Sequence, residues 1–331
     1  MFNTTKNIKI PNTARLSFDK DLSVYWIRHG VSCNNIKSNF GKLIENTHNP
    51  TLTRYSMTGS CWMGNQLKLQ NKIEPEYVFC SDLLRTIQTA ILMFPKHFFE
   101  GKIKIIRGVA EIGFTGNRPD TKEETLNILK KWLNYINYYF NEDIPFKIQD
   151  QEGPIIRDDQ CTNRFKELKE KNQTKLLENL YENYDKTQPN IIKDTEIIKK
   201  IRKLYGDENI AIVSHENYIN KYVAKSIPKL KNNQLLIKKY KINDYDNYIK
   251  EDYSDLYNNG CSLTNNEYNC NINNESMSLD IKYKKRKECD KTFFEKEINR
   301  QTENIKFGGG FKKSKRNLKT KYKNRKRTKK N

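Results

Sequence analysis

The stretch RHGVSCNN at residues 28–35 comes directly after the apolar run LSVYWI at residues 22–27. A short run rich in Val, Tyr, Trp and Ile predicts a buried strand, which we expect to end at Ile27. Arg28 and His29 then begin the loop at the carboxyl end of that strand. Open α/β sheets bind their ligands outside this edge, so we expect both side chains at a binding site.

Three further segments repeat this pattern of a short strand followed by a charged side chain. They are YVFC at 77–80, before a helix with Arg85 in its first turn; the run 102–106, before Glu111; and IAIVS at 210–214, before His215 and a helix over 216–227. Strands that alternate with helices predict parallel pairing. The predicted fold class is therefore α/β, a three-layer sandwich whose mainly parallel sheet carries helices on both faces.

The predicted strand ends would bring two arginines, two histidines and one acid to a single pocket. These residues are Arg28, Arg85, His29, His215 and Glu111. Guanidinium groups grip phosphate oxygens in pairs, and the amides that begin the Arg85 helix can face an anion. A neutral imidazole can attack phosphorus, and a carboxyl group can protonate the leaving oxygen. The residue types therefore indicate phosphoryl chemistry, for which we predict no metal and no cofactor.

Four motifs in this order resemble those of the histidine phosphatase superfamily, in the branch that includes the cofactor-dependent phosphoglycerate mutases. The motifs are RHGVSCNN (28–35), SDLLRTIQTA (81–90), AEIGF (110–114) and IVSHEN (212–217). Together they span roughly residues 19–225. An RHG tripeptide alone is a weak signal, whereas four motifs in family order, each at an expected strand end, are a specific one.

The resemblance implies a role for each matching residue. The catalytic residues would be His29 as the nucleophile that becomes phosphohistidine, Glu111 as general acid and then base, and His215. The phosphate-binding residues would be Arg28, Arg85, Ser32 and Asn35, with His215 completing the clamp. We therefore predict a metal-independent phosphatase that hydrolyses a phosphomonoester, carried by a small molecule or a phosphoprotein.

The sequence departs from the family pattern at three places. Val31 stands where a Glu or similar polar residue is common, and Glu216 stands where Gly is usual. Unless it turns outward, the Glu216 carboxylate would repel a phosphate dianion and raise the pKa of His215. Residues 113–119 replace the Gly-x-x-x-Gly segment of the mutases, so hydrolysis is favoured over mutase activity.

Two alternatives to a phosphatase stay open. One is a catalytically inactive phosphate-binding domain tethered to nucleic acid by a basic tail. The departures from the family pattern at Val31 and Glu216 favour this alternative. The other is a mutase-like phosphotransferase, which needs a stable phosphoenzyme and a lid that excludes water. The motif set favours hydrolysis, because mere binding would not need His29.

We predict three parts: an N-terminal extension (1–18), a catalytic domain (19–290) and a disordered basic tail (291–331). A helical lid insertion is predicted over about 115–190, with a capping box at Thr121–Glu124, a helix to about 140 and another over 164–181. A helix over 194–205 should end at Gly206. Further on we predict a strand at 235–242, a mobile insertion at about 243–259 and a final edge strand of the sheet at 260–264.

Seven cysteines, at 33, 61, 80, 161, 261, 270 and 289, show no CxxC pair, so a zinc site is not expected. The odd count, the lack of a signal peptide and the lack of a membrane-spanning run indicate a reducing intracellular compartment. We predict an intracellular protein, cytoplasmic or nuclear and not secreted. Cys33 is expected to be a buried, inert thiol rather than an oxidation-sensitive one.

The charge of the chain is concentrated at its C-terminal end. Residues 306–331 hold thirteen Lys or Arg and no acid, which is +13 of the net +21. Such a segment cannot bury a core, and Gly308–Gly310 would act as a flexible joint. Its expected partners are polyanions, with nucleic acid or nuclear import favoured over a solvated tail without a partner or an acidic membrane surface.

Overall fold

A computed structural model describes residues 21–35, 48–71, 73–112, 118–139, 170–224, 230–242, 249–252, 259–263, 267–272 and 275–280. The predicted N-terminal extension and basic tail lie outside these residues. Within them, no helix combines the length and the apolar character that crossing a membrane requires.

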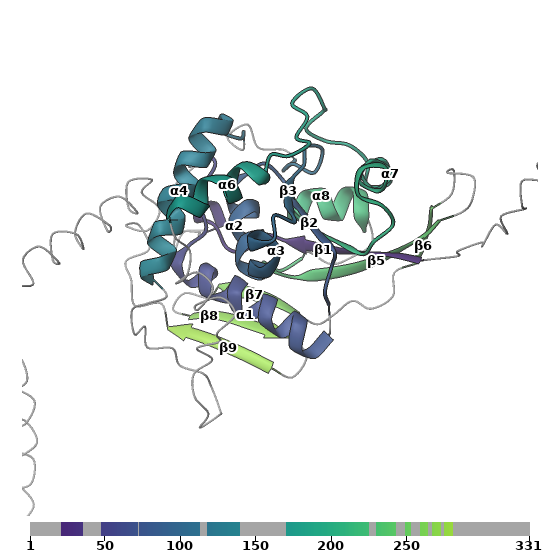
Figure 1. The fold of residues 1–331 in the computed structure, drawn as a ribbon. Coiled ribbons are helices and arrows are strands. Elements are labelled where there is room, and N and C mark those ends of the chain that lie inside the picture. Colours follow the sequence, from purple (N-terminus) through teal and green to yellow (C-terminus); the bar gives the residue numbers. More distant parts are fainter. Residues whose placement is uncertain are drawn as a thin grey trace, which may run out of the picture.

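A six-stranded sheet forms the centre of the molecule (Figure 1). In spatial order its strands are β3 (Ile103–Ile105), β2 (Tyr77–Cys80), β4 (Ile210–Ser214), β1 (Asp21–Arg28), β5 (Leu235–Ile242) and β6 (Ile249–Asp252). The first four strands are parallel, and β5 and β6 run antiparallel to their neighbours. The predicted mainly parallel sheet is confirmed, and the first five of these strands lie where the sequence predicts them.

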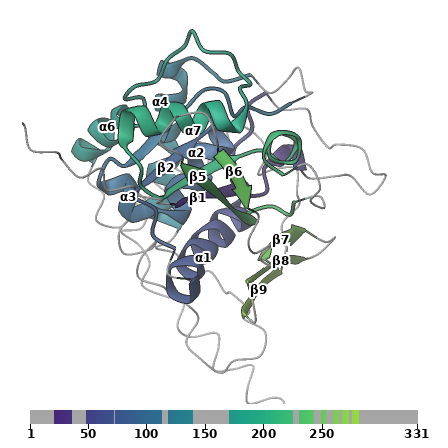
Figure 2. The ribbon, with the colours of Figure 1, turned by 90° about the vertical axis from the view of Figure 1, so that its right-hand side faces the viewer.

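Helices cover both faces of this sheet, which confirms the three-layer α/β sandwich. They are α1 (Arg54–Asn71), α2 (Leu84–Met93), α3 (Pro95–Phe99), α4 (Lys122–Tyr139), α6 (Glu170–Asn179), α7 (Asp194–Tyr205) and α8 (Glu216–Tyr218). Ile27 faces one apolar core, shared with α1 to α4 and α6, while its neighbour Trp26 faces a second core, shared with α7 and α8. Neighbouring strand residues point to opposite faces, so both faces are buried. Figure 2 shows α7 and α1 on opposite sides of the sheet.

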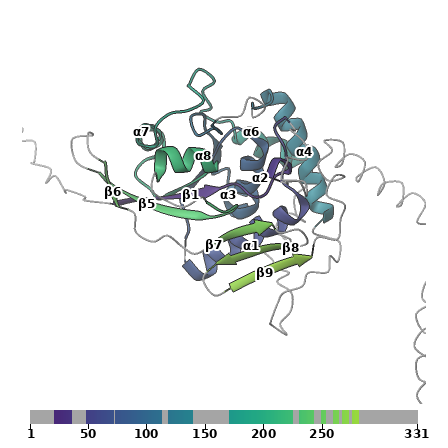
Figure 3. The ribbon, with the colours of Figure 1, turned by 180° about the vertical axis from the view of Figure 1, so that it is seen from behind.

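Helix α1 was not predicted, because its sequence lacks an amphipathic pattern. It is buried on nearly every side from Tyr55 to Leu67, between α2 on one side and a second, smaller sheet on the other (Figure 3). Small side chains allow this close packing. A Cβ on Gly64 would collide with the backbone of Met93 in α2, so the two helices touch where that side chain is missing.

The second sheet corrects the prediction of a final edge strand at 260–264. Strand β7 (Asn259–Leu263) pairs with β8 (Glu267–Ile272), which pairs with β9 (Glu275–Asp280), all antiparallel and separate from the central sheet. At the edge of the central sheet where β7 was predicted, the structure has β5 and β6. Strand β6 falls inside the segment predicted as a mobile insertion, where residues 249–252 pair with β5. The mobility of that segment stays a prediction.

The helices after Glu111 follow the sequence closely. The predicted capping box begins α4, since the Thr121 hydroxyl accepts from the Glu124 amide at 3.2 Å and the Thr121 amide donates to the Glu124 carboxylate at 3.0 Å. Helix α7 ends before Gly206, as predicted. The helix predicted over 216–227 is shorter, because α8 passes into a π-helical turn at Ile219–Val223. Helices α4 and α6 lie within the predicted insertion, whose role as a lid stays a prediction.

The cysteines correct the sequence interpretation. Cys261 and Cys270 form a disulfide between β7 and β8. Cys33 and Cys61 each take part in a disulfide too. Among the described cysteines, Cys80 is the free thiol, and burial raises its pKa. Cys33 is therefore not the inert thiol that was predicted, and cysteine usage does not support a reducing compartment.

Candidate active site

Five of the predicted site residues meet at the carboxyl edge of the central sheet. His29 follows β1 and His215 follows β4, and these strands are neighbours: the His29 amide donates to the Ser214 carbonyl at 3.0 Å. Arg85 is the second residue of α2, Glu111 lies beyond the end of β3, and Arg28 is the last residue of β1. Both histidines and Arg85 are buried. The strand-end pattern thus places these five residues correctly, while their roles stay predictions.

Arg85 connects the two histidines. Its Nε donates to His29 Nε2 at 3.1 Å, and its Nη2 lies 3.4 Å from His215 Nδ1. The imidazole centroids are 5.1 Å apart, with the rings edge to face. On its other side, His29 Nδ1 lies 2.6 Å from the Gly30 carbonyl oxygen. A proton on Nδ1 satisfies that contact, and the lone pair of Nε2 then faces the guanidinium.

Both imidazoles are neutral at pH 7. Burial, aided by the charges of Arg85 and Arg28, holds the pKa of His29 well below its usual value. Burial and the Arg85 charge also lower the pKa of His215 to about 4, although Glu111 acts in the opposite direction. A neutral imidazole has the free electron pair that a nucleophile needs.

Glu111 is ionised at neutral pH. Its Oε2 lies 3.3 Å from His215 Nδ1 and 3.5 Å from Arg85 Nη2. Burial by itself would raise its pKa, but the hydrogen bond with His215 and the charges of Arg85 and Arg28 lower the pKa to about 2. To donate a proton, this carboxylate must first receive one.

Arg28 is held by Glu216. Its Nη1 lies 2.6 Å from Glu216 Oε2 and also donates to the carbonyl of Leu230. The Glu216 carboxylate therefore turns toward an arginine of the site and not outward. The rise in the pKa of His215 that was expected from Glu216 does not occur, because burial and the charge of Arg85 lower that pKa.

Three buried polar atoms of the site have no hydrogen-bond partner among the described residues. They are Arg28 Nε, Arg85 Nη1 and Glu111 Oε1. Buried polar groups are normally paired, and leaving one unpaired costs about 1–3 kcal/mol. An oxyanion in the pocket would supply the acceptors that the two donors lack.

Ser32 and Asn35, two predicted phosphate ligands, bind each other. The amide and hydroxyl of Ser32 donate to Asn35 Oδ1 at 2.9 and 3.0 Å, in a 3₁₀ turn at Cys33–Asn35. None of the contacts among the described residues joins this pair to the histidines or arginines. Their role as phosphate ligands stays a prediction, whereas a role in shaping the loop is visible. Val31 is buried in the core, and its carbonyl accepts from the Thr53 amide at 3.0 Å.

Sequence reasoning missed the residues that support the two histidines. Ser81 Oγ lies 3.1 Å from His215 Nε2, and Ser81 follows β2 as His29 follows β1, so the strand-end pattern was a usable signal. Asn232 Nδ2 donates to the His29 carbonyl at 2.9 Å from a loop that carries no motif. A Cβ on Gly30 would lie 2.4 and 2.9 Å from the hydroxyls of Ser56 and Ser60 in α1, so a larger residue here would force these two side chains to move.

His29, Glu111 and His215 are close enough to share a metal ion, with ligand atoms within 4.8 Å of one another. Arg85, however, contacts all three residues from inside the cluster. A guanidinium at that position repels a cation and attracts an anion. The arrangement fits an oxyanion better than a metal.

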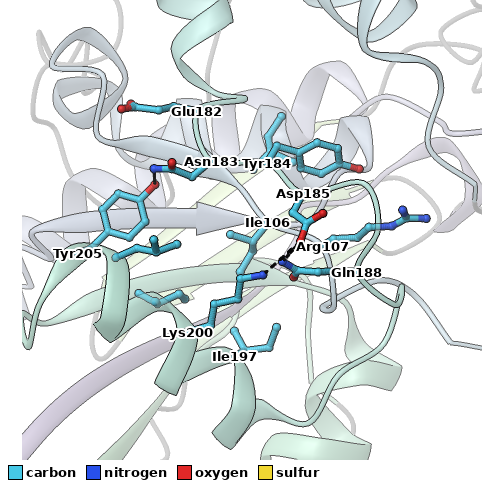
Figure 4. A pocket seen from close by; sticks show the side chains of 13 residues that line it. Ile106, Arg107, Glu182, Asn183, Tyr184, Asp185, Gln188, Ile197, Lys200 and Tyr205 are labelled. Carbon is cyan, nitrogen blue, oxygen red and sulfur yellow. Dashed lines mark hydrogen bonds and ion pairs between the residues drawn. The ribbon is translucent and has the colours of Figure 1, made fainter.

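A pocket lies away from the histidines, between β3, α7 and the segment 182–188 (Figure 4). Several of its polar side chains bind each other, and others bind residues outside the pocket, such as Glu182 with Lys104 and Tyr184 with Asp82. Lys200 lies 3.8 Å from Asp185 Oδ2, Gln188 donates to the same oxygen at 2.9 Å, and Asn183 donates to the Tyr205 hydroxyl at 3.0 Å. Nothing in this pocket matches the chemistry of the five-residue cluster.

The fold resembles solved structures of phosphatases. Similar structures include a mycobacterial glucosyl-3-phosphoglycerate phosphatase (12% identity; 71% of this chain and 98% of that chain; TM-score 0.38). Another is a phosphoserine phosphatase mutant from Entamoeba histolytica (16% identity; 70% of this chain and 94% of that chain; TM-score 0.35). A third is a putative alpha-ribazole-5'-P phosphatase from Escherichia coli (15% identity; 70% of this chain and 95% of that chain; TM-score 0.34). These neighbours are members of the histidine phosphatase superfamily. No family model and no curated protein matches the sequence. At these TM-scores the likeness carries no argument about activity, which rests on the site residues.

Proposed function

We propose that this protein is a phosphatase that hydrolyses a phosphomonoester through a phosphohistidine on His29. The observation that carries this proposal is the contact between Arg85 Nε and the Nε2 atom of a neutral, buried His29. That contact puts a nucleophilic lone pair beside a cation suited to phosphate oxygens. Two unpaired arginine donors in the same pocket support it.

The first chemical step would be attack of His29 Nε2 on phosphorus. An incoming phosphoryl oxygen would take over the Arg85 hydrogen bond and so release the lone pair. As the N–P bond forms, the ester P–O bond breaks, and the leaving oxygen takes a proton from Glu111, whose ionised carboxylate must have received that proton beforehand. Arg28, Arg85 and His215 would stabilise the charge on the phosphoryl oxygens, which is usually the largest contribution in such reactions.

The second step would be hydrolysis of the phosphohistidine. Glu111, now ionised, would accept a proton from water as the water oxygen attacks phosphorus. The N–P bond then breaks, and neutral His29 and inorganic phosphate are regenerated. His29 Nδ1 keeps its proton on the Gly30 carbonyl throughout, which holds the ring in one tautomer. Every group in this scheme belongs to the protein, so we propose that no metal is needed.

The test is hydrolysis of p-nitrophenyl phosphate in EDTA between pH 5 and 8. We expect turnover in the wild type and a loss of at least about 1,000-fold in His29→Ala. His48→Ala is a matched control, because His48 is half-exposed and pairs with Asp120 outside the site. Activity retained in His29→Ala would contradict the nucleophile. Activity abolished by EDTA would contradict metal independence.

One observation favours an inactive phosphate-binding domain as the second candidate: Glu216 already occupies Arg28. Binding of inorganic phosphate without turnover of any phosphomonoester would decide for it. A phosphotransferase would instead show a phosphohistidine that decays faster when an acceptor alcohol is added.

For the basic tail we propose a polyanion partner, with nucleic acid first. Thirteen cations within residues 306–331 would release counterions on binding. Deleting this segment should leave p-nitrophenyl phosphate hydrolysis unchanged and should weaken salt-sensitive binding to duplex DNA. DNA binding that is equal with and without the tail would contradict this partner.

A further inference from the structure

Glu216 lies in the proposed phosphate pocket, although no step of the proposed reaction uses it. It directly follows His215 as the first residue of α8, and its carboxylate forms a 2.6 Å ion pair with Arg28. The side chains of Arg28 and Glu216 are only 12% and 11% exposed. An ion pair so shielded from water interacts more strongly than one on the surface.

Glu216 changes the charge that the pocket offers to a ligand. Within the part of the chain that the structure describes, the charged groups that face one another are Arg28 from β1, Arg85 from α2, Glu111 from the segment after β3 and Glu216 from α8, with neutral His29 and His215 between them. Two cations and two carboxylates give a formal charge of zero. A doubly charged phosphoryl group would therefore bring two uncompensated negative charges into the pocket, whereas a singly charged group would bring one.

Three atoms of the site that lack a hydrogen-bond partner in the described part of the chain match the same singly charged form. Arg28 Nε and Arg85 Nη1 are donors, and Glu111 Oε1 is an acceptor. A fully deprotonated phosphoryl group has acceptors only and would leave Glu111 Oε1 facing a negative oxygen. A singly protonated group has oxygens for the two arginines and one P–OH to donate to Glu111.

We propose that Glu216 is a specificity-determining residue that makes the pocket select the singly protonated, monoanionic phosphoryl group. This inference rests on the proposed function only in placing the phosphoryl group in this pocket. It also accounts for the proton that the ionised Glu111 needs. The P–OH proton would reach Glu111 with the substrate and would then pass to the leaving oxygen.

Phosphate and sulfate test this proposal, because both are tetrahedral and differ in charge at pH 5.5. Phosphate is then mainly the monoanion, and sulfate is a dianion without a proton to donate. Equilibrium binding of each anion to the full chain should show a preference for phosphate of about tenfold or more. In Glu216→Gln the pocket gains one positive charge, so sulfate should bind about tenfold more tightly and the preference should shrink.

Glu123→Gln is the matched control, since Glu123 is exposed on α4 and the substitution removes the same charge. It should leave the preference unchanged. Equal binding of the two anions by the wild type, or an unchanged preference in Glu216→Gln, would overturn the proposal. Should Glu216→Gln fail to fold, calorimetry of the wild type in two buffers of different ionisation enthalpy replaces it. At pH 8, phosphate binding should take up about one proton, and binding without proton uptake would overturn the proposal.

These measurements do not depend on turnover. A wild type that prefers phosphate but hydrolyses no phosphomonoester would sink the proposed phosphatase and leave this inference standing. A wild type that hydrolyses p-nitrophenyl phosphate but binds both anions equally would support the proposed phosphatase and overturn this inference.

Discussion

The cluster around His29 and the pocket in Figure 4 are both lined by polar and charged side chains, but they differ in how these are paired. In the Figure 4 pocket, Asp185 binds Lys200 and Gln188, and Asn183 binds Tyr205. Around His29, buried donors of Arg28 and Arg85 and an acceptor of Glu111 have no partner among the described residues.

This difference separates a structural polar network from a prepared site. Mutually satisfied side chains gain little from a ligand, which would first have to break their hydrogen bonds. Unsatisfied buried groups gain from one that matches them, and holding them in place beforehand is what electrostatic catalysis requires. Substitutions in the two regions should therefore have unequal effects on activity.

The largest contrast is expected between Arg85 and Arg107, the arginine that lines the Figure 4 pocket. Arg85→Lys loses the planar fork that reaches His29, His215 and Glu111, so kcat/KM for p-nitrophenyl phosphate should fall about 1,000-fold. Arg107→Lys removes hydrogen bonds to Asn190 and Lys186 without touching the cluster and should change kcat/KM less than about twofold. Equal losses in both variants would erase the functional distinction between the regions.

A smaller contrast is expected between two carboxylates. Glu111→Gln cannot protonate the leaving oxygen, so hydrolysis of an alkyl phosphate should fall about 100-fold, while p-nitrophenyl phosphate, with its good leaving group, should lose much less. Glu182→Gln, in the wall of the Figure 4 pocket, should affect neither substrate. An equal loss for both substrates in Glu111→Gln would remove Glu111 from the acid role.

The sequence predicted the residues clustered around His29 better than it predicted the residues that hold them in place. His29, Arg85, Glu111 and His215 were found because each follows a short apolar strand, and the ends of parallel strands meet in space. The ion pair of Glu216 with Arg28 was not foreseen, because the direction of a side chain depends on its neighbours and not on its position in the chain. Asn232 was missed for a similar reason: it reaches His29 from a loop about two hundred residues away.

The same limit explains the errors in the fold. Helix α1 is enclosed on nearly all sides, so no polar face produced a helical period in its sequence. The sequence of β7 reads equally well as an edge strand of either sheet, and its place was decided by β5 and β6 at the edge of the central one. Cysteine spacing did not reveal the Cys261–Cys270 disulfide, which joins paired residues of β7 and β8.

The last contrast concerns acid stability, where Glu111 can be compared with Asp185 of the Figure 4 pocket. The pKa of Glu111 is lowered from 4.5 to about 2 in the folded protein. Its ionised form therefore stabilises the fold above about pH 4.5, and this contribution is lost as the pH falls toward 2. From the size of that shift, the loss is about 3 kcal/mol in the free energy of unfolding. His215 adds a loss at higher pH, because its lowered pKa makes the fold lose stability as the pH falls from 6.5 to about 4.

Urea unfolding at several pH values would separate these contributions. In Glu111→Gln the decline in unfolding free energy between pH 4.5 and 2 should become shallower than in the wild type. The pKa of Asp185 is also lowered, first by the hydrogen bond from the Thr187 hydroxyl, but its side chain is 44% exposed. Solvent screens such a group, so Asp185→Asn should leave the acid decline unchanged. A decline as steep in Glu111→Gln as in the wild type would mean that the Glu111 carboxylate is not held by Arg85 and His215 in solution.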